Sequence, residues 1–233
     1  MIPLYFEETG FCLIPNMLES ESTAALADDF ELQRARTKGH SLRNVHQSPL
    51  VREAAYGGYV FGHAQAILGS NARLVRAIYF DKLPESNWSV PWHQDLTIAV
   101  SAKHETPGFS PWSQKDGVWH VQPPAEILEQ MVTIRIHLDD CGLENGPVRV
   151  KAGSHLFGKI KESEMETWDA EEIACTGSKG SALIMRPLLL HASSPSKLPA
   201  HRRILHLEYA VAELPSPLRW HLDVEATMSE RSN

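Results

Sequence analysis

Two stretches of alternating residues constrain the fold of this 233-residue chain more than any other feature. In residues 130–138 and again in residues 202–210, one set of alternate side chains is mostly hydrophobic. Because successive side chains of a strand point to opposite faces, each stretch predicts a strand with a hydrophobic face and a more polar one. The more polar faces carry Met131, Thr133, Arg135 and His137 in the first stretch, and Arg202, Ile204, His206 and Glu208 in the second. Such a face either meets water or lines a site inside a barrel or jelly roll, and the alternation alone does not decide between them.

The order of the expected elements favours a mainly β fold. A short strand over residues 9–15 is followed by helices over residues 20–36 and 49–68, and short strands dominate the rest of the chain. The Asn-Gly pair within residues 144–147 predicts a hairpin between two of these strands. Helices first and strands afterwards predict a jelly roll supported by N-terminal α-helices, in a single domain over residues 1–233.

Composition and charge disfavour several classes of partner. The chain is 42% hydrophobic and 22% charged, and its net charge of −7 disfavours nucleic acid and anionic membranes as main partners. No hydrophobic run approaches the roughly 20 residues that span a bilayer, and the N-terminus lacks the pattern of a signal peptide. The three cysteines are scattered without metal-binding spacing, which is typical of reduced thiols in a cytoplasmic protein. None of these features defines an oligomeric state.

The segment over residues 96–129 is long, rich in tryptophan and proline, and inserted between two expected strands. Insertions of this length in a compact domain are commonly lids or binding loops. Its ends lie next to the candidate site described below, so Trp112, Trp119 and His120 are expected to contact a substrate. The alternative is that the two tryptophans only pack the segment against the rest of the domain.

The pentapeptide Pro91-Trp92-His93-Gln94-Asp95 carries the strongest chemical signal. Residues i and i+2 of an extended chain project to the same face, so His93 and Asp95 can bind one metal ion. Together with His191 they would form the two-histidine, one-carboxylate set of non-haem Fe(II) oxygenases, which leaves three coordination positions open. Other pairs with the same spacing are His137/Asp139, His206/Glu208 and His221/Asp223. Most of these pairs must therefore be incidental.

Arg202 and Ser193 supply what a 2-oxoglutarate site needs. The 2-oxo acid group of this co-substrate chelates the metal, whereas its distal carboxylate needs a fork-shaped cation, which arginine provides better than lysine. Arg202 comes eleven residues after His191, at the start of the second alternating stretch, and Ser193 can add a hydrogen bond. Arg202 is preferred to Arg203 because it shares the polar strand face with His206.

A series of motifs occurs in a fixed order along the chain. They are Trp92-His93-Gln94-Asp95, His137-Leu138-Asp139-Asp140, Glu144-Asn145-Gly146-Pro147, Gly153-Ser154-His155, and His191-x-Ser193 with Arg202. This combination resembles the phytanoyl-CoA dioxygenase (PhyH) family over about residues 5–212, with no assignable match in residues 96–129. The resemblance implies a double-stranded β-helix fold, with Fe(II), 2-oxoglutarate and O2 as cofactor and co-substrates.

The resemblance also sorts the competing histidine pairs. It implies that His137/Asp139 is structural, because the pair falls at the end of a strand before the Asn-Gly turn. The pair His221/Asp223 lies beyond the last expected strand and is interpreted as incidental.

Further contacts follow from the resemblance. Ile78 and Arg43 match positions near the co-substrate, and we expect them to contact 2-oxoglutarate. Arg135 stands where many family members have an aromatic residue; it can contact 2-oxoglutarate or an anionic substrate, or form a salt bridge inside the barrel. Thr133 is a further expected substrate contact.

These features predict an Fe(II)/2-oxoglutarate-dependent dioxygenase that hydroxylates an unactivated C–H bond of a small molecule and releases succinate and CO2. His93, Asp95 and His191 would bind the iron, and no separate catalytic acid or base is needed because the cofactor carries the difficult chemistry. Desaturation, cyclisation or epimerisation with the same cofactors is the nearest alternative. More distant alternatives are a metal-dependent hydrolase and a non-catalytic metal-binding module.

Overall fold

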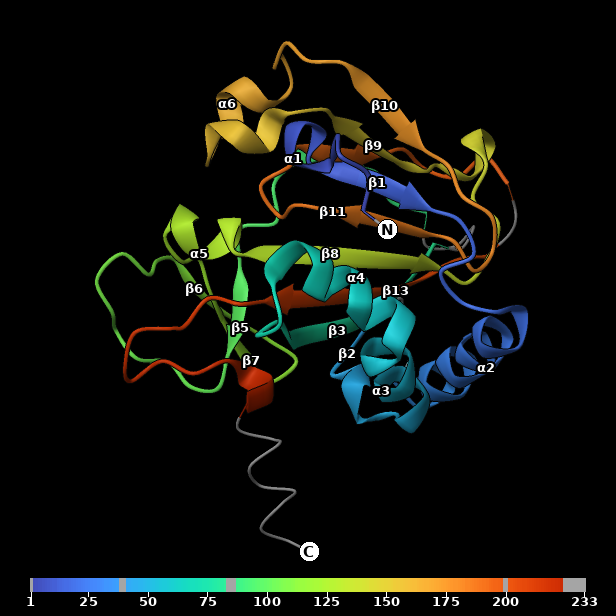
Figure 1. Cartoon of the computed structure of the whole chain (residues 1–233), viewed down its shortest axis with the longest axis horizontal. Helices are drawn as coiled ribbons and strands as arrows, with labels where there is room; N and C mark the ends of the chain where they lie inside the picture. Colours follow the sequence, from blue (N-terminus) through green and yellow to red (C-terminus); the bar gives the residue numbers. More distant parts are fainter. Residues whose placement is uncertain (1, 38–40, 83–86, 199–200, 224–233) are drawn as a thin grey trace, which may run out of the picture.

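Antiparallel sheets with helices on the outside make up the protein (Figure 1). The computed structural model describes residues 2–37, 41–82, 87–198 and 201–223. Within these ranges, the largest sheet has the strand order β1-β11-β8-β13-β3-β2, and the second has the order β10-β9-β12-β4. A small third sheet has the order β5-β7-β6.

The bounds of the elements are as follows. The large sheet contains β1 (Phe11–Ile14), β11 (Ala182–Met185), β8 (Met131–His137), β13 (Arg202–Ala210), β3 (Arg73–Lys82) and β2 (Ser41–Arg43). The four-stranded sheet contains β10 (Glu172–Cys175), β9 (Val148–Lys151), β12 (His191–Ser193) and β4 (Val90–His93), and the small sheet contains β5 (Ile98–Val100), β7 (Val118–Val121) and β6 (Trp112–Lys115). The helices are α1 (Phe6–Thr9), α2 (Ser20–Thr37), α3 (Pro49–Tyr56), α4 (Gly58–Leu68), α5 (Ala125–Glu129) and α6 (Glu162–Met165), with short 3-10 turns η1 (Val45–Gln47), η2 (Leu143–Asn145) and η3 (Ser154–Phe157).

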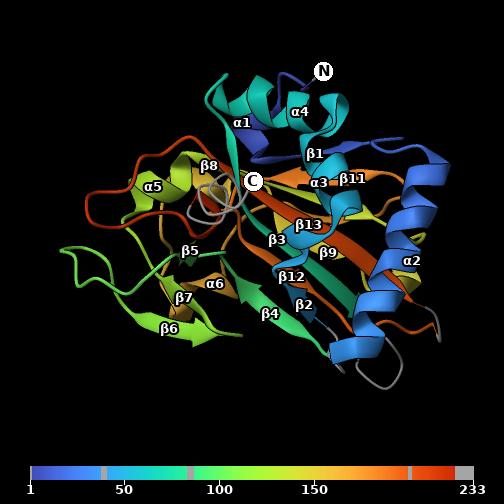
Figure 2. The ribbon, with the colours of Figure 1, turned by 90° about the horizontal axis from the view of Figure 1, so that it is seen from below.

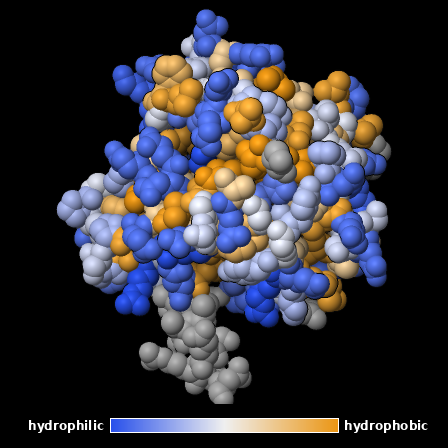
Figure 3. All heavy atoms as spheres, in the orientation of Figure 1, coloured by the Kyte–Doolittle hydropathy of each residue, from blue (hydrophilic) through white to orange (hydrophobic). Residues whose placement is uncertain are grey.

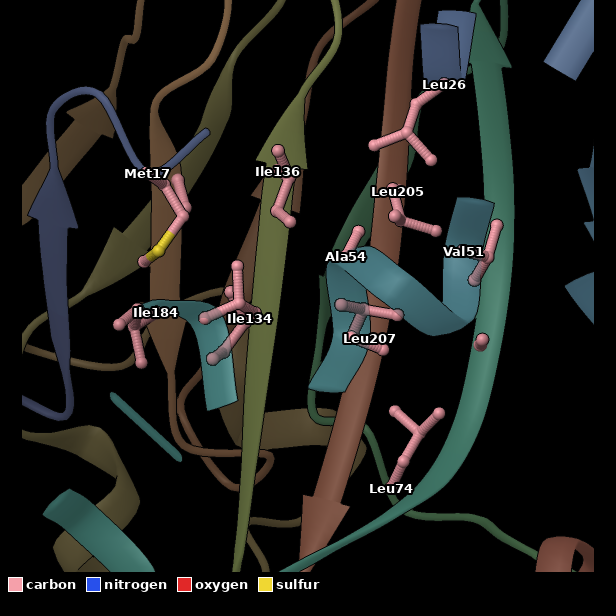
Figure 4. Close-up of a cluster of buried hydrophobic side chains, with 14 of the residues drawn as sticks. Met17, Leu26, Val51, Ala54, Leu74, Ile134, Ile136, Ile184, Leu205 and Leu207 are labelled. Carbon is pink, nitrogen blue, oxygen red and sulfur yellow. The ribbon is translucent and has the colours of Figure 1, made fainter. Parts of the chain in front are cut away.

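The main hydrophobic core lies between the large sheet and helices α2, α3 and α4. Ile134 and Ile136 of β8 and Leu205 and Leu207 of β13 pack with helix side chains such as Val51 (Figure 4). All five side chains are fully buried. Burying a side chain of this size contributes about 1.5–3 kcal/mol, so the hydrophobic half of each alternating stretch holds the helices against the sheet.

The other faces of β3, β8 and β13 turn toward the four-stranded sheet. The antiparallel register places His206 of β13 beside Arg135 of β8 on one side and Ile78 of β3 on the other. Figure 2 shows α3 and α4 on one side of β3 and β13, with β4 and β12 on the opposite side. The more polar faces of the alternating stretches therefore look into the space between two sheets.

Most of the predicted elements are confirmed, and one connection is wrong. Helices α2, α3 and α4 and strands β8 and β13 agree with the expected ranges to within two residues. The hairpin predicted at Asn145-Gly146 does not exist, because the flanking strands β8 and β9 belong to different sheets. Gly146 has a φ of 58°, and a Cβ atom there would lie 2.3 Å from the carbonyl oxygen of Ser194. The Asn-Gly pair thus serves a tight crossing between sheets, which only glycine can make.

Residues 96–129 form the small sheet and helix α5 rather than an irregular loop. Trp112 and Trp119 meet edge to face with ring centroids 6.4 Å apart, and both pack against a second hydrophobic cluster that includes Trp220. The β6–β7 hairpin turns at Asp116 and Gly117, which have φ values of 49° and 81°. Such values are typical of a type I′ hairpin turn, for which Asp-Gly is a preferred sequence.

The outer surface is largely polar. Figure 3 shows polar side chains over most of the face that carries the helices, with hydrophobic side chains gathered toward its centre. None of the helices in the described ranges combines the length and the hydrophobicity needed to cross a membrane. Cys12, Cys141 and Cys175 are buried and form no disulfide.

Candidate metal centre

A pocket of about 240 Å³ lies between the large sheet and the four-stranded sheet. Its hydrophobic lining includes Ile78, Phe80, Val90, Val148, Ala192 and Ile204. Its polar lining consists of Arg43, Arg76, Lys82, His93, Asp95, Thr97, Lys115, Arg135, His191, Ser193, Arg202 and His206. A pocket in which metal-binding groups and several cations converge is the default candidate for a functional site.

His93, Asp95 and His191 come together at one wall of this pocket. Strands β4 and β12 are antiparallel neighbours, and their register places His191 opposite His93. One ligand atom from each of the three residues lies within 4.8 Å of the others. The Nε2 atom of His191 is 3.7 Å from Oδ2 of Asp95, and the two imidazole rings are 4.1 Å apart between centroids. The structure thus brings together the three residues that the sequence singled out.

Backbone contacts set the two imidazoles in the same orientation. Nδ1 of His93 lies 2.9 Å from the carbonyl oxygen of Pro91, and Nδ1 of His191 lies 2.9 Å from that of Leu189. A carbonyl oxygen only accepts, so each Nδ1 carries the hydrogen and each Nε2 carries the lone pair. Metal-binding histidines are commonly oriented in this way. Burial lowers the pKa of His191 to about 3, with a smaller contribution from His93, so its imidazole is neutral at pH 7.

Asp95 completes the set as an ionised carboxylate. Its Oδ2 atom is buried and accepts no hydrogen bond from any residue in the described ranges. Burial raises the pKa of Asp95, but the imidazoles of His191 and His93 and the guanidinium of Arg76 outweigh it, and the pKa lies below the ordinary range. Two imidazoles and one carboxylate with a buried oxygen that has no partner among the described residues fit a divalent cation such as Fe(II).

The competing pairs have other partners. Arg203 donates to both carboxylate oxygens of Asp139, at 2.6 and 2.9 Å, which leaves this carboxylate no free position for a metal. Nε2 of His206 lies 2.8 Å from Oε1 of Glu208, so these two residues are bonded to each other. Asp223 lies 3.9 Å from Nη1 of Arg73.

A second group of acidic and imidazole ligands, Glu31, Asp81 and His201, lies elsewhere in the described part of the chain. Its charges are already balanced by cations, because Arg34 lies 3.5 Å from Asp81 and Arg203 lies 3.3 Å from Glu31. Nδ1 of His201 also lies 2.8 Å from Asp81. This group is an ion-pair network between α2 and the start of β13, and the positive charge within it disfavours a metal ion.

One end of the pocket is built for an anion. Nη1 of Arg202 donates to the carbonyl oxygen of Gly146, whereas its Nε is buried without a hydrogen-bond partner among the described residues. Lys82 lies opposite Arg202 in the β3–β13 register, and its Nζ donates to Oγ of Ser193 at 3.0 Å. Burial, with help from the guanidinium groups of Arg202 and Arg135, lowers the pKa of Lys82 to about 7. Two buried cations and a hydroxyl group form a suitable cradle for a carboxylate.

Arg135 begins a chain of polar contacts that crosses the large sheet. Its Nη1 donates to Nδ1 of His206 at 2.8 Å, so Nε2 of His206 carries the hydrogen and donates to Glu208. Arg76 in turn donates to the same oxygen of Glu208. Phe80 lies 5.8 Å from the Arg135 guanidinium, in cation–π geometry. Among the described residues Arg135 thus contacts a histidine instead of forming the salt bridge that was considered, and the carboxylates of Asp95 and Glu208 act on its charge from further away.

The other predicted contacts divide into two groups. Ile78 and Arg43 line the pocket, as expected of residues near a co-substrate or substrate. Trp112, Trp119, His120 and Thr133 are absent from its lining. His120 lines a small crevice behind Arg43 and Arg76. From residues 96–129 the pocket is lined by Thr97 and Lys115, whereas Trp112 and Trp119 pack against the second hydrophobic cluster. Contact of Trp112, Trp119, His120 and Thr133 with a substrate therefore stays a prediction.

Sequence reasoning missed the roles of Lys82, Arg76 and Lys115. Two of them could have been found, because Arg76 and Lys82 are spaced by even numbers from Ile78 and share its strand face. For Lys115 the signal was the Asp116-Gly117 turn, which places the end of β6 at a hairpin tip.

Replacement of Trp119 with alanine tests whether this side chain packs the small sheet or contacts a substrate. We expect the free energy of unfolding to fall by about 1–3 kcal/mol, because a partly buried aromatic side chain is lost from a cluster. Urea denaturation of the variant beside the wild-type protein measures the change. A variant with unchanged stability and impaired substrate turnover would instead assign Trp119 to the substrate site.

Solved structures share this fold at low sequence identity. A non-haem alpha-ketoglutarate-dependent carbocyclase, SnoK from nogalamycin biosynthesis, is 17% identical, with a TM-score of 0.66 over 88% of this chain and 81% of that chain. The epimerase SnoN, in complex with Fe3+, alpha-ketoglutarate and nogalamycin RO, is 14% identical, with a TM-score of 0.68 over 91% and 88%. HygX from Streptomyces hygroscopicus, with nickel and 2-oxoglutarate bound, is 15% identical, with a TM-score of 0.64 over 88% and 84%.

Sequence comparison gives the family. No curated protein matches the chain. The model of the family described as phytanoyl-CoA dioxygenase (PhyH) matches residues 6–204, which is most of the chain and includes every residue of the candidate metal centre. The chain therefore belongs to the phytanoyl-CoA dioxygenase (PhyH) family.

Proposed function

We propose that this protein hydroxylates an unactivated C–H bond of a small molecule and releases succinate and CO2. As a member of its family it is an Fe(II)- and 2-oxoglutarate-dependent oxygenase. The observation that supports the proposal most is the convergence of three metal-ligand atoms in a pocket that also has an anion-binding end. We infer that the two facing sheets are those of a double-stranded β-helix and that the chain forms a single domain.

In this proposal His93, Asp95 and His191 bind Fe(II) through Nε2, a carboxylate oxygen and Nε2. Bound Fe(II) and 2-oxoglutarate supply the O2-dependent oxidation. The carbonyl oxygens of Pro91 and Leu189 hold the imidazoles in the ligating tautomer, and three open positions remain for the reactants.

Arg202, Lys82 and Ser193 bind the distal carboxylate of 2-oxoglutarate. The unpaired Nε of Arg202 and the ammonium group of Lys82 donate to it, and Ser193 lies two residues from His191 on the same strand. Phe80 and Ile204 line the same pocket, and their hydrophobic surfaces exclude water from the co-substrate. A carboxylate held in this way fixes the orientation of the whole co-substrate.

Ring formation and epimerisation are the second candidate outcome. The observation that favours them is the structural likeness to enzymes named as a carbocyclase and an epimerase, although identities of 17% and 14% show only a shared fold. The residues that bind metal and co-substrate would be the same. Product mass separates the outcomes, because hydroxylation adds one oxygen atom and the other two reactions do not.

The proposed function is tested by reconstituting the purified protein with Fe(II) and 2-oxoglutarate and measuring succinate. We expect slow succinate formation even without a substrate, and only when Fe(II), 2-oxoglutarate and O2 are all present. Protein that binds Fe(II) but forms no succinate under any of these conditions would overturn the enzymatic role and favour a non-catalytic metal-binding module.

The affinity for 2-oxoglutarate is expected to fall as the pH rises from about 7 to about 9. Lys82, with a pKa of about 7, is mostly charged below this pH and mostly neutral above it. A bound carboxylate favours the charged ammonium and raises the pKa of Lys82, so binding above pH 7 takes up a proton. The affinity then falls by at most about tenfold per pH unit, since one proton is involved. Calorimetric titrations with 2-oxoglutarate at several pH values measure this dependence.

The matched variant for this prediction is Lys82→Arg. Arginine remains charged throughout this pH range, so the variant should bind 2-oxoglutarate with little dependence on pH. The same slope in Lys82→Arg and in the wild-type protein would show that another group titrates.

A further inference from the structure

A second group of cations lies at the other end of the pocket from Lys82 and Arg202. It consists of Arg43 at the end of β2, Arg76 on β3 and Lys115 at the tip of the β6–β7 hairpin. Lys115 lies at an exposed hairpin tip, where partial desolvation and, after it, the guanidinium groups of Arg43 and Arg76 lower its pKa, so the three side chains lie near one another. This group, here called the outer cation cluster, is contributed by two separate sheets.

Arg76 of the outer cation cluster lies toward the opposite end of β3 from Lys82. Arg76 and Lys82 are six residues apart on β3, which corresponds to about 20 Å along an extended strand. A five-carbon acid chelated at the metal is much shorter than this distance. If 2-oxoglutarate occupies the Arg202 end and leaves Arg43 free, contrary to the contact expected from the family resemblance, the outer cation cluster remains available for another ligand.

The charge of the pocket exceeds what metal and co-substrate require. Among its described lining residues are six cationic side chains, Arg43, Arg76, Lys82, Lys115, Arg135 and Arg202, against one carboxylate, Asp95. Glu208 behind the lining and Asp116 at its edge compensate two of these charges. Fe(II) and the 2-oxoglutarate dianion cancel each other, so three positive charges remain when Lys82, with a pKa of about 7, is charged, and two when it is neutral. The chain as a whole has a net charge of −7, which makes this local excess specific to the pocket.

The two carboxylates beside the outer cation cluster, those of Asp116 and Glu208, compensate its positive charge only in part. The carboxylate of Asp116 lies 3.1 Å from Nε of Arg43, but this side chain is 67% exposed, and exposed ion pairs contribute little. Glu208 contacts only Arg76 of the three cations, and Nε of Arg76 remains buried without a partner among the described residues. Lys115 makes no ion pair with any described residue. An incoming oxyanion would supply the missing acceptors.

We propose that the substrate carries an oxyanion, a phosphate or a carboxylate group, which binds between Arg43, Arg76 and Lys115. This inference rests on the proposed function, because it assigns the substrate class of the same site. Arg76 and Lys115 both interact with the charge of Asp95, so the outer cation cluster lies near the candidate metal centre. The anion therefore anchors one part of the substrate at the hairpin tip while another part extends toward the metal. The anion replaces the carboxylate of Asp116 beside Arg43.

The test uses the protein loaded with Fe(II) and saturated with 2-oxoglutarate under argon, with inorganic phosphate and acetate as separate probes. Calorimetry measures the affinity of each probe for the wild-type protein and for Lys115→Gln and Arg43→Gln. We expect each variant to bind the preferred probe roughly tenfold more weakly, since a charge-assisted hydrogen bond is lost. Tighter binding of phosphate indicates a phosphorylated substrate, and tighter binding of acetate indicates a carboxylic acid.

Lys103→Gln is the matched control within the same insertion. Lys103 lies 5.9 Å from the rings of Trp112 and Trp119 and pairs with Glu105, outside the pocket lining. Its replacement should leave probe affinity unchanged. If Lys103→Gln and Lys115→Gln weakened probe binding equally, the loss would come from the overall charge of the protein and not from the pocket. That result would overturn the proposal. Lys115 is exposed at a hairpin tip, so its variant is expected to fold even if Arg43→Gln does not.

Failure of this inference is distinguishable from failure of the proposed function. The same wild-type preparation is assayed for succinate formation from 2-oxoglutarate without substrate. Succinate formation combined with no binding of either probe, or with binding that Lys115→Gln leaves intact, overturns the anionic substrate alone. Absence of succinate formation overturns the enzymatic proposal, and the anion site then falls with it as a substrate site.

Discussion

Alanine in place of His93, Asp95 or His191 is expected to abolish tight Fe(II) binding and to reduce succinate formation more than about 100-fold. Mutation of groups that merely orient metal ligands commonly costs 10- to 100-fold in metal affinity, so loss of a ligand itself costs more. Equilibrium dialysis with measurement of bound iron gives the affinity, and the succinate assay gives the activity.

His137→Ala is the matched control for the metal ligands. His137 is also a buried histidine in an His-x-Asp pair, but its partner Asp139 is bound by Arg203. This variant should retain Fe(II), even if the lost side chain lowers its stability. Loss of iron from His137→Ala together with retention by His93→Ala would show that the wrong pair had been assigned.

Arg202→Ala is expected to weaken 2-oxoglutarate binding by about 2–4 kcal/mol, or roughly 30- to 1,000-fold. The guanidinium is buried, and its Nε has no hydrogen-bond partner among the described residues. The variant therefore loses a donor that is free to bind the distal carboxylate. Burial lowers the pKa of Arg202 to about 10, which still leaves it charged at pH 7. Titration of succinate formation against the concentration of 2-oxoglutarate measures the loss.

Arg203→Ala provides the comparison, because the neighbouring arginine points away from the pocket. Its guanidinium contacts Asp139 and Glu31 on the helix side of the sheet. The variant should lose stability through this network and keep its affinity for 2-oxoglutarate. Equal losses of affinity in the two variants would show that the strand face on which each arginine lies does not determine 2-oxoglutarate binding.

Short-range geometry predicted that His93 shares a strand face with Asp95 and that Arg202 shares one with His206. The addition of distant His191, and the choice of this pair over the others, depended on the resemblance to the family. Alternation with a period of two shows which side chains share a face, and β8 and β13 display it clearly since their outer faces are almost wholly hydrophobic. Strand β3 obeys the same rule, but Ile78 and Phe80 on its inner face match the hydrophobic residues on its outer face. Alternation alone therefore does not distinguish the two faces of β3, and only the even spacing from Ile78 points to Arg76 and Lys82.

Features that depend on tertiary placement could not be read in this way. The Asn145-Gly146 pair has the composition of a hairpin turn, yet it connects two different sheets and contacts the chain at Ser194. Trp112 and Trp119 have the composition of a binding lid, yet they find partners in a local cluster with Trp220. The local sequence predicts the conformation of a segment. The tertiary contacts of that segment determine which of its side chains reach the site.

The metal position is also the most direct test of the whole account. Crystals of the protein soaked with Fe(II) without O2 allow the iron to be located by its anomalous scattering. The account predicts one iron peak within bonding distance of Nε2 of His93, Nε2 of His191 and a carboxylate oxygen of Asp95. Iron at Glu31, Asp81 and His201, or no iron between the three predicted ligands, would contradict it.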